Sequence, residues 1–236
     1  MLGTIVNALA IIVGAFFGIL LKKGIPEKIS DLVMKAVGLC VLYVGLSGAL
    51  EGKNSLVMII SMVFGAVIGG LLDLDDKLKR LGLFCEEKLS KNKENGTFAE
   101  GFVTASLLFC VGAMAIVGPL QSGLSNDNST LFTKSILDGI SSIIFASQFG
   151  VGVMLSALAV FVYQGSIALL AQWVAPVLSE AAICEMTCVG SLLIIGLALN
   201  ILKITKIKVM NFVPAIFLVP IVLWAYNFIA NFITRW

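Results

Sequence analysis

The chain has 236 residues, of which 59% are hydrophobic and 13% are charged, and its mean hydropathy is +1.05. That composition excludes a soluble globular domain and predicts an all-α polytopic membrane protein embedded in a lipid bilayer. The net charge of +2 is too small to indicate a nucleic-acid partner. The chain has no histidine and its five cysteines are scattered, so the sequence predicts neither a metal nor a cofactor.

The apolar runs, taken in chain order, predict a bundle of about eight transmembrane helices. A hydrocarbon core of about 30 Å is crossed by roughly 20 apolar residues in a helix. The first run, 2–21, has no basic segment before it and no small-residue cleavage site after it, so we expect a retained span and not a signal peptide. The later candidate spans are 32–50, 55–74, 99–120, 132–149, 151–173, 181–202 and 211–233.

The run 132–149 is short and polar, so a re-entrant hairpin is an alternative to a full crossing and would leave seven spans. Loop charge favours the full crossing. Basic residues are concentrated at 75–94 and at 203–208, and cytoplasmic loops carry such an excess. Both loops lie inside only if 132–149 crosses completely, and the resulting topology places both termini outside the cytoplasm.

Residues 75–97 predict a cytoplasmic loop that contains an amphipathic helix. Apolar residues recur here at helical spacing between charged ones, as in a helix lying along the membrane surface. We expect a structural role for this helix. The residues of the apolar repeat are Leu74, Leu78, Leu81, Cys85 and Leu89.

Internal similarity indicates two related halves within a single transmembrane domain, 1–236. The segment 7–11 resembles 156–160, and the predicted topology makes the two halves run in opposite directions. Inverted repeats of this kind are common in transporters. The predicted parts are a first three-helix repeat at 1–74, a central helix pair at 98–149 and a second three-helix repeat at 150–236.

Two pairs of small residues predict close helix packing. Gly14 and Gly18 lie one turn apart on the first span, and Gly65 and Gly69 do so on the third. Such pairs let helix backbones approach each other. The partner is either another helix of this chain or a second copy, so a homo-oligomer is an open alternative.

The stretch 112–148 carries the groups that hydrocarbon tolerates least, so it predicts a pathway or binding site inside the membrane. Pro119 lacks a backbone N–H and clashes with the preceding turn, so we expect the fourth span to break near Gly118 and to leave carbonyls that an ion could contact. The candidate site residues of this stretch are Gly112, Gly118, Pro119, Gln121, Asp138, Ser141, Ser142 and Gln148.

The polar residues of the run 132–149 fall on one side of the predicted helix. Asp138, Ser141, Ser142 and Gln148 lie within an arc of about 120°. Such a stripe can line a pore. The alternative is that Asp138 lies near the outer interface and that the serines bond to the preceding turn.

Isolated polar residues on other spans are further candidates. Each alone predicts an interhelical hydrogen bond, but they converge on one site if the two halves pack around the central pair. Without histidine, carboxylates are the candidate proton relays, with Asp138 first and Glu100 second. These candidates are Asn7, Glu100, Thr104, Gln164 and Asn200.

Three segments carry a resemblance to a known family. They are the opening GTIVN at 3–7, MKAVGLC at 34–40, and FCVGAMAIVGPLQ at 109–121 followed by KSILDG at 134–139. Over nearly its whole length the chain resembles the bacterial integral membrane proteins of domain of unknown function 554 (YdfK/YqgA-like). The resemblance implies a bacterial plasma-membrane protein, and it supplies no catalytic or binding residues.

These observations together predict a membrane transporter or channel for a small solute or ion, with its pathway near Gly118–Pro119 and Asp138. The charge of the solute and the choice between channel and carrier stay open. A non-transporting membrane scaffold or regulator is the alternative. An intramembrane enzyme is less well supported, because Ser141 or Ser142 beside Asp138 has no histidine or evident lysine as its base, and we expect no catalytic residues.

Overall fold

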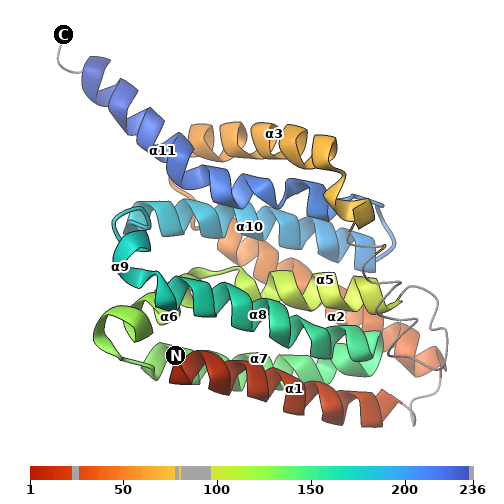
Figure 1. Cartoon of the computed structure of the whole chain (residues 1–236). Coiled ribbons are helices and arrows are strands. Elements are labelled where there is room, and N and C mark those ends of the chain that lie inside the picture. Colours follow the sequence, from red (N-terminus) through yellow and green to blue (C-terminus); the bar gives the residue numbers. More distant parts are fainter. Residues whose placement is uncertain (23–26, 78–79, 81–96, 234–236) are drawn as a thin grey trace.

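The computed structural model describes residues 1–22, 27–77, 80 and 97–233, and every regular element in these ranges is a helix (Figure 1). This confirms the predicted fold, a polytopic helical bundle. The long helices are α1 (Leu2–Lys22), α2 (Glu27–Ala49), α3 (Ser55–Leu72), α7 (Ser129–Phe149), α8 (Val151–Leu169), α10 (Glu180–Ile201) and α11 (Pro214–Ile233). The shorter ones are α5 (Thr97–Cys110), α6 (Ala113–Ser125), α9 (Ala171–Val174) and the 3-10 turn η1 (Val209–Phe212).

Six helices of the described chain are long and apolar enough to cross a membrane, and α5 and α6 together qualify as a seventh span that is bent by 61°. The more polar α7 is not among them. It has 21 residues, which extend over about 31 Å, so its length suffices for a full crossing. The prediction of eight crossings therefore depends on α7, and it stays a prediction.

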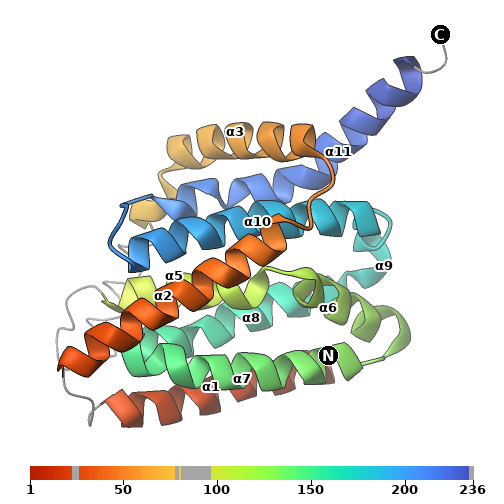
Figure 2. The same ribbon diagram turned by 180° about the vertical axis from the view of Figure 1, so that it is seen from behind.

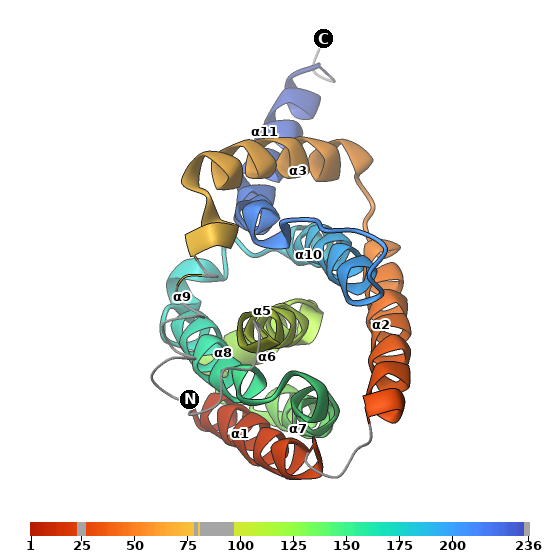
Figure 3. The same cartoon turned by 90° about the vertical axis from the view of Figure 1, so that its right-hand side faces the viewer.

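The helices form two groups that meet at α10. In the first, α7 and α8 both pack against α1, and α5 and α6 pack against α8. In the second, α2 packs on one side of α10, while α11 packs on α10 and carries α3 on its outer side. Figure 3 shows this order along the bundle, from α1 and α7 at one extreme to α3 and α11 at the other.

The two ends of the bundle differ in charge. α1 begins and α11 ends at the end that lies on the left of Figure 1. At the opposite end the loop after α10 brings Lys203 within 3.9 Å of Asp31, near the start of α2. The same loop brings Lys208 within 3.1 Å of Asp76, just after α3. The basic loop 203–208 thus lies at the end of the bundle where α2 begins and α3 finishes.

The bundle has an apolar outside as well as an apolar core. Leu9 and Phe16 of α1, and Phe64 and Leu71 of α3, point away from the protein and are exposed. A soluble protein seldom leaves such large contiguous apolar surfaces in water, whereas lipid tails cover them. The outward faces of α1 and α3 are therefore the surface that meets the bilayer.

Both predicted small-residue pairs serve packing within the chain. A Cβ atom added to Gly14 would lie 2.2 Å from the Gly139 carbonyl oxygen of α7, and one added to Gly18 would lie 2.3 Å from that of Ile143. Gly65 and Gly69 meet the beginning of α11 and the residues before it in the same way. Since both pairs pack within the chain, neither of them supports the alternative of a homo-oligomer.

The helix break of the fourth span lies at Gly112 and not at Gly118–Pro119, which corrects the prediction. α5 ends at Cys110 and α6 begins at Ala113. Gly112 has φ +112°, a backbone conformation that glycine adopts without strain. Pro119 lies inside α6, where its missing N–H removes one hydrogen bond, to Ala115, without ending the helix.

The predicted amphipathic helix of the loop 75–97 lies almost entirely outside the described residues. Residues 74–77 are helical. Leu78, Leu81, Cys85 and Leu89, on which that prediction depends, are not among the residues that the structure describes. The prediction is therefore neither confirmed nor corrected.

Candidate intramembrane ion-pair site

A buried ion pair on α7 is the chemical centre of the first helix group. The Lys134 Nζ atom donates to both carboxylate oxygens of Asp138, at 2.8 Å to Oδ1 and 2.6 Å to Oδ2. The side chains are only 7% and 8% exposed. Both charges are thus removed from solvent and bonded to each other, which is the arrangement that a low-dielectric interior requires.

Local sequence brings the pair together. Residues four apart lie above each other on one helix face, so Lys134 and Asp138 meet along α7 without help from another element. The neighbouring hydroxyls satisfy themselves within the helix: Ser135 Oγ donates to the Leu131 carbonyl and Ser142 Oγ to the Gly139 carbonyl. These hydroxyls therefore do not bond to the ion pair, and the face of α7 that carries Lys134 and Asp138 can contact groups from other helices.

Asn7 of α1 is the first of those groups. Its Nδ2 atom donates to Asp138 Oδ2 at 3.0 Å and also approaches Gln164 Oε1 of α8, at 3.2 Å. Asn7 and Gln164 are both fully buried. The amide of Asn7 thus joins three helices, α1, α7 and α8, and adds a second donor to the carboxylate of Asp138.

The site lies within the length of its helices and not at their ends. Asp138 is nine residues into α7, and Asn7 is five residues into α1. At the helical rise these positions are about 14 Å and about 8 Å from the helix starts.

Several polar atoms around the ion pair have no hydrogen-bond partner within the described chain. They are Asn7 Oδ1, Gln164 Nε2 and, one turn earlier on α1, Thr4 Oγ1. All three residues are fully buried. A buried polar atom without a partner costs free energy, so such a group of them is typical of a place that receives a ligand, a water or an ion.

An aromatic ring closes the site on the side of α5. The Lys134 Nζ atom lies 6.0 Å from the centre of the Phe109 ring, within the range of a cation–π contact. Phe109 is buried and is followed directly by Cys110 and the break at Gly112. The ion pair therefore lies next to the end of α5, where the chain leaves helical geometry.

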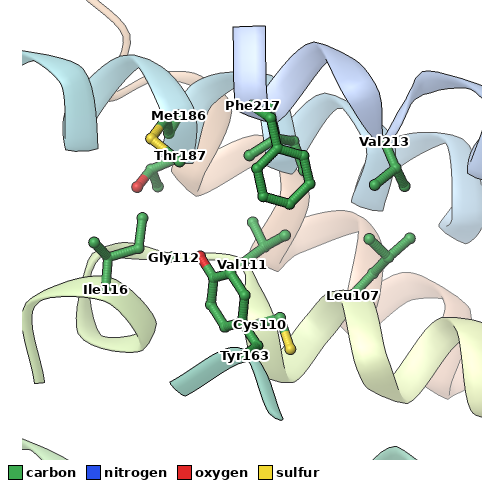
Figure 4. A pocket seen from close by; sticks show the side chains of 11 residues that line it. Leu107, Cys110, Val111, Gly112, Ile116, Tyr163, Met186, Thr187, Val213 and Phe217 are labelled. Atoms are coloured by element: carbon green, nitrogen blue, oxygen red, sulfur yellow. The ribbon is translucent and has the colours of Figure 1, made fainter. Parts of the chain in front are cut away.

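A small cavity of about 90 Å³ adjoins this break (Figure 4). Its walls come from the α5–α6 junction, α8, α10 and α11, and they are mostly apolar. Tyr163 extends into it from α8, with Thr187 and Met186 facing it from α10. Cys110 and Tyr163 line this cavity, and their chain neighbours Phe109 and Gln164 contact the ion-pair site.

Three of the predicted site residues come together here: Asn7, Asp138 and Gln164. The remaining residues of the predicted α7 stripe lie further along the helix. Ser142 faces α1, where a Cβ atom on Gly14 would come within 2.3 Å of its Oγ, and Ser141 is half-buried. Gln148 is buried one residue before the end of α7, beside Ser147.

The other predicted residues have separate locations. Gln121 accepts a hydrogen bond from Thr130 Oγ1 at the α6–α7 turn. Asn200 closes the loop after α10, because its Oδ1 accepts from Thr205 Oγ1 and Ile207 N. Glu100 is exposed at the start of α5, and Thr104, one turn later, is fully buried.

Gly112, Gly118 and Pro119 belong to the bent span itself. Gly112 forms the break and lines the cavity. Gly118 and Pro119 are buried within α6, and a Cβ atom on Gly118 would lie 3.0 Å from the Leu131 side chain of α7. Gly118 therefore lets α6 pack against α7, one turn from Lys134.

Lys134 is the site residue that sequence reasoning missed. We predicted a stripe of Asp138 with the hydroxyl and amide residues after it and no evident lysine beside it, whereas Lys134 Nζ contacts the Asp138 carboxylate. The signal was present, because a lysine and an aspartate at this spacing on an otherwise apolar helix predict an ion pair. Thr4, one turn before Asn7 on α1, is a second buried polar residue that the sequence prediction did not include.

A second buried carboxylate, Glu185 of α10, has a different environment. Its Oε1 atom accepts from the backbone N–H groups of Lys53 and Asn54, each at 2.8 Å. Asn54 caps the start of α3. Glu185 therefore anchors the α2–α3 turn to α10, which is a structural role of a kind that Asp138 does not have.

Fold and site together define a polytopic membrane protein with an ion pair buried inside its helical bundle. The model of the family described as "Protein of unknown function (DUF554)" matches residues 2–224, and the chain belongs to this family. That membership confirms the resemblance found in the sequence.

Two relatives extend the comparison. The chain is 36% identical to "Uncharacterized membrane protein YdfK" of Bacillus subtilis (strain 168), over 96% of this chain and 97% of that protein. It is 28% identical to "Uncharacterized protein YqgA" of Escherichia coli (strain K12), over 92% and 94%. No solved structure matches the chain.

Proposed function

We propose that this protein transports a small solute or ion across the bacterial plasma membrane, through a pathway that includes the Lys134–Asp138 site. The observation that supports this proposal is the ion pair itself, with a separation of 2.6 Å and both side chains more than nine-tenths buried. Ionisable residues at this depth of a membrane are rare, and they commonly mark substrate pathways and proton relays.

Stability gives no reason for such a pair. Desolvating two charges costs several kcal/mol each, and a buried pair is often matched or exceeded in stability by apolar residues of similar volume. Lys134 precedes Asp138 along α7, which is also the less favourable order for a helical pair. A role in binding or transport accounts for the retention of both charges, whereas a purely structural role does not.

The proposed inverted repeat places part of this site between two corresponding helices. α1, α2 and α3 correspond in order to α8, α10 and α11, and each helix packs against its counterpart: α1 on α8, α2 on α10, and α3 on α11. Figures 1 and 2 show the members of each pair running in opposite directions. Transporters with inverted repeats bind their substrates between the halves, and Asn7 and Gln164 come from one such pair.

The bent span supplies the second element that transporters use. Broken helices expose backbone groups and dipolar ends to a substrate within the membrane. The break at Gly112 borders a cavity of about 90 Å³ beside the ion pair. We propose that the pathway passes this break, that the basic end of the bundle faces the cytoplasm with both termini outside, and that the protein has no enzymatic activity.

The test is solute flux with purified protein in lipid vesicles. A panel of labelled inorganic ions and small metabolites is presented to vesicles that contain the wild type, Asp138→Asn or the surface control Lys35→Met. We expect at least one solute to enter with the wild type and the control and not with Asp138→Asn. Equal flux in Asp138→Asn removes this site from the pathway. A folded protein that transports nothing in the panel supports a scaffold or regulator.

A further inference from the structure

We propose that the buried site binds a small uncharged solute of the amide or alcohol class, through atoms of Asn7, Gln164 and Thr4. This inference rests on the proposed transport function and names the class of substrate. It is supported by three atoms that have no hydrogen-bond partner within the described chain: Asn7 Oδ1, Gln164 Nε2 and Thr4 Oγ1. All three residues are fully buried, so solvent at the surface of the bundle does not reach them.

The carboxylate of Asp138 determines which atom of each amide is left over. An ionised carboxylate only accepts hydrogen bonds, so Asn7 must turn its NH2 group towards Asp138. The same NH2 group donates to Gln164 Oε1, so both hydrogens of Asn7 are used and Gln164 turns its oxygen towards Asn7. An acceptor, Asn7 Oδ1, and a donor, Gln164 Nε2, remain. The ion pair thus fixes the polarity of the binding atoms.

Charge balance favours an uncharged ligand over an ion. The charges of Lys134 and Asp138 compensate each other at 2.6 Å. The other buried charged side chains of the described chain lie elsewhere, because Asp75 follows α3 and Glu185 holds the α2–α3 turn. The amino group of Met1, at the start of α1, is only partly buried. An added ion would therefore lack a counter-charge in a site without solvent, which is costly, whereas an uncharged molecule brings no such cost.

The contact between the two amides limits the size of the ligand. Asn7 Nδ2 and Gln164 Oε1 are 3.2 Å apart. Within one amide group the nitrogen and the oxygen are about 2.2 Å apart, so the acceptor Oδ1 and the donor Nε2 are separated by at most about 8 Å. Two hydrogen bonds of about 2.9 Å take up most of that distance. The donor and acceptor of the ligand are therefore one hydroxyl group or the two ends of one amide group.

Thr4 provides a third contact for the same molecule. It lies one turn before Asn7 on α1, and residues at this spacing share a helix face with their Cβ atoms about 5–6 Å apart. Its hydroxyl can donate or accept. A primary amide carries two N–H groups and a carbonyl, and an alcohol carries one O–H group and two lone pairs. Either group has a partner for each of the three buried atoms.

The experiment measures the binding of small probes to the purified protein in detergent by saturation-transfer NMR, which detects weak ligands through their own methyl signals. Acetamide and methanol are the uncharged probes. Acetate and methylguanidinium are an anion and a cation of similar size. We expect saturation transfer to at least one uncharged probe, and none to the two ions above the background of empty detergent micelles.

Two substitutions remove the proposed binding atoms and should keep the fold. Gln164→Leu and Thr4→Val delete buried polar atoms that lack partners in the described structure, and they preserve much of the side-chain shape, so little stability is lost. Each lost hydrogen bond should weaken binding of the uncharged probe by about 2- to 10-fold. The control is Ser166→Ala on α8, because Ser166 is exposed and bonds to the Val162 carbonyl of its own helix.

Two results would overturn the proposal directly. The first is equal saturation transfer to the uncharged probe in Gln164→Leu and Ser166→Ala. The second is binding of acetate or methylguanidinium as strong as that of acetamide. Absence of binding by both uncharged probes would also overturn it, and a higher unfolding temperature of Gln164→Leu would then assign the three atoms to structural water.

The remaining outcomes separate this inference from the proposed function. Binding of an uncharged probe that depends on Gln164, without flux of any solute into vesicles, would support the binding site and refute transport. Asp138-dependent flux of an ion, without binding of either uncharged probe, would leave transport standing and refute the uncharged class of substrate.

Discussion

Two ion pairs of the same spacing have opposite environments in this protein. Lys134 and Asp138 on α7 are 7% and 8% exposed, whereas Lys35 and Asp31 on α2 are 63% and 52% exposed at a similar distance of 2.8 Å. The exposed pair lies in the first nine residues of α2, on the outer surface of the bundle, whereas other helices enclose the buried pair. The comparison shows that a spacing of four residues is enough to form an ion pair on a helix. Burial inside the bundle is what distinguishes the Lys134–Asp138 pair as a candidate site.

Breaking the buried pair should have the largest effect. Lys134→Met leaves the Asp138 carboxylate without its counter-charge, so we expect the free energy of unfolding to fall by about 3–5 kcal/mol. Thermal unfolding in detergent, followed by the fluorescence of the three tryptophans, measures the change. A loss no larger than that of Lys35→Met would show that the two environments are equivalent and would contradict the comparison.

Separating α1 from α7 should have the next largest effect. In Gly14→Ala the new Cβ atom would lie 2.2 Å from the Gly139 carbonyl oxygen, so α1 must move and take Asn7 with it. Overpacking of this kind costs about 1–3 kcal/mol. The matched control is Gly70→Ala on α3, where a Cβ atom meets nothing within 4 Å and where alanine favours the helix. If both variants unfold at the same temperature, the close α1–α7 contact does not hold the site.

Removing the exposed pair should have a small effect that depends on salt. For Lys35→Met we expect a loss of about 0.2–0.5 kcal/mol, because an exposed pair on a helix gains little in water. The loss should diminish as sodium chloride is raised from low to near-molar concentration, whereas that of Lys134→Met should change little, since a buried pair is poorly screened. A salt-sensitive loss in both variants would mean that solvent reaches the buried pair.

A substitution of Lys208, in the basic loop after α10, should have the smallest effect on the unfolding temperature, and only at high pH. The hydrogen bond that Lys208 donates to Asp76, together with the charge of Asp73, raises the pKa of Lys208 above its ordinary value. A raised folded-state pKa contributes stability below the unfolded-state pKa, and that contribution is lost as the pH rises through the raised one. The unfolding temperature of the wild type should therefore fall slightly more than that of Lys208→Gln when the pH passes the lysine range. Parallel curves for the two proteins would contradict this.

Hydropathy was sufficient for the fold because each span satisfies its own backbone. The first predicted run, 2–21, coincides with α1 to within one residue, since in lipid a long apolar segment has no alternative to a helix. The site was harder to predict from the sequence. Asn7, Asp138 and Gln164 were recognisable as polar residues in apolar helices, yet Asn200 and Gln148 carried the same signal and lie elsewhere.

The missed and misplaced features have specific physical causes. A glycine at positive φ and a proline inside a helix look alike as helix breakers, and only the packing around α5 and α6 determines that Gly112 breaks the span and Pro119 does not. Lys134 was readable from its spacing to Asp138. The convergence of α1, α7 and α8 on that pair depends on tertiary contacts, which no local pattern encodes.

The central claim is that the buried pair is kept for transport and not for folding, and one doubly substituted protein tests it. Lys134→Met combined with Asp138→Asn removes both charges together, and the new amide oxygen can still accept from Asn7. We predict stability within about 1 kcal/mol of the wild type, because a buried pair replaced as a unit costs little, and complete loss of solute flux in vesicles prepared from the same sample. Retained flux, or a protein as unstable as Lys134→Met alone, would contradict the account.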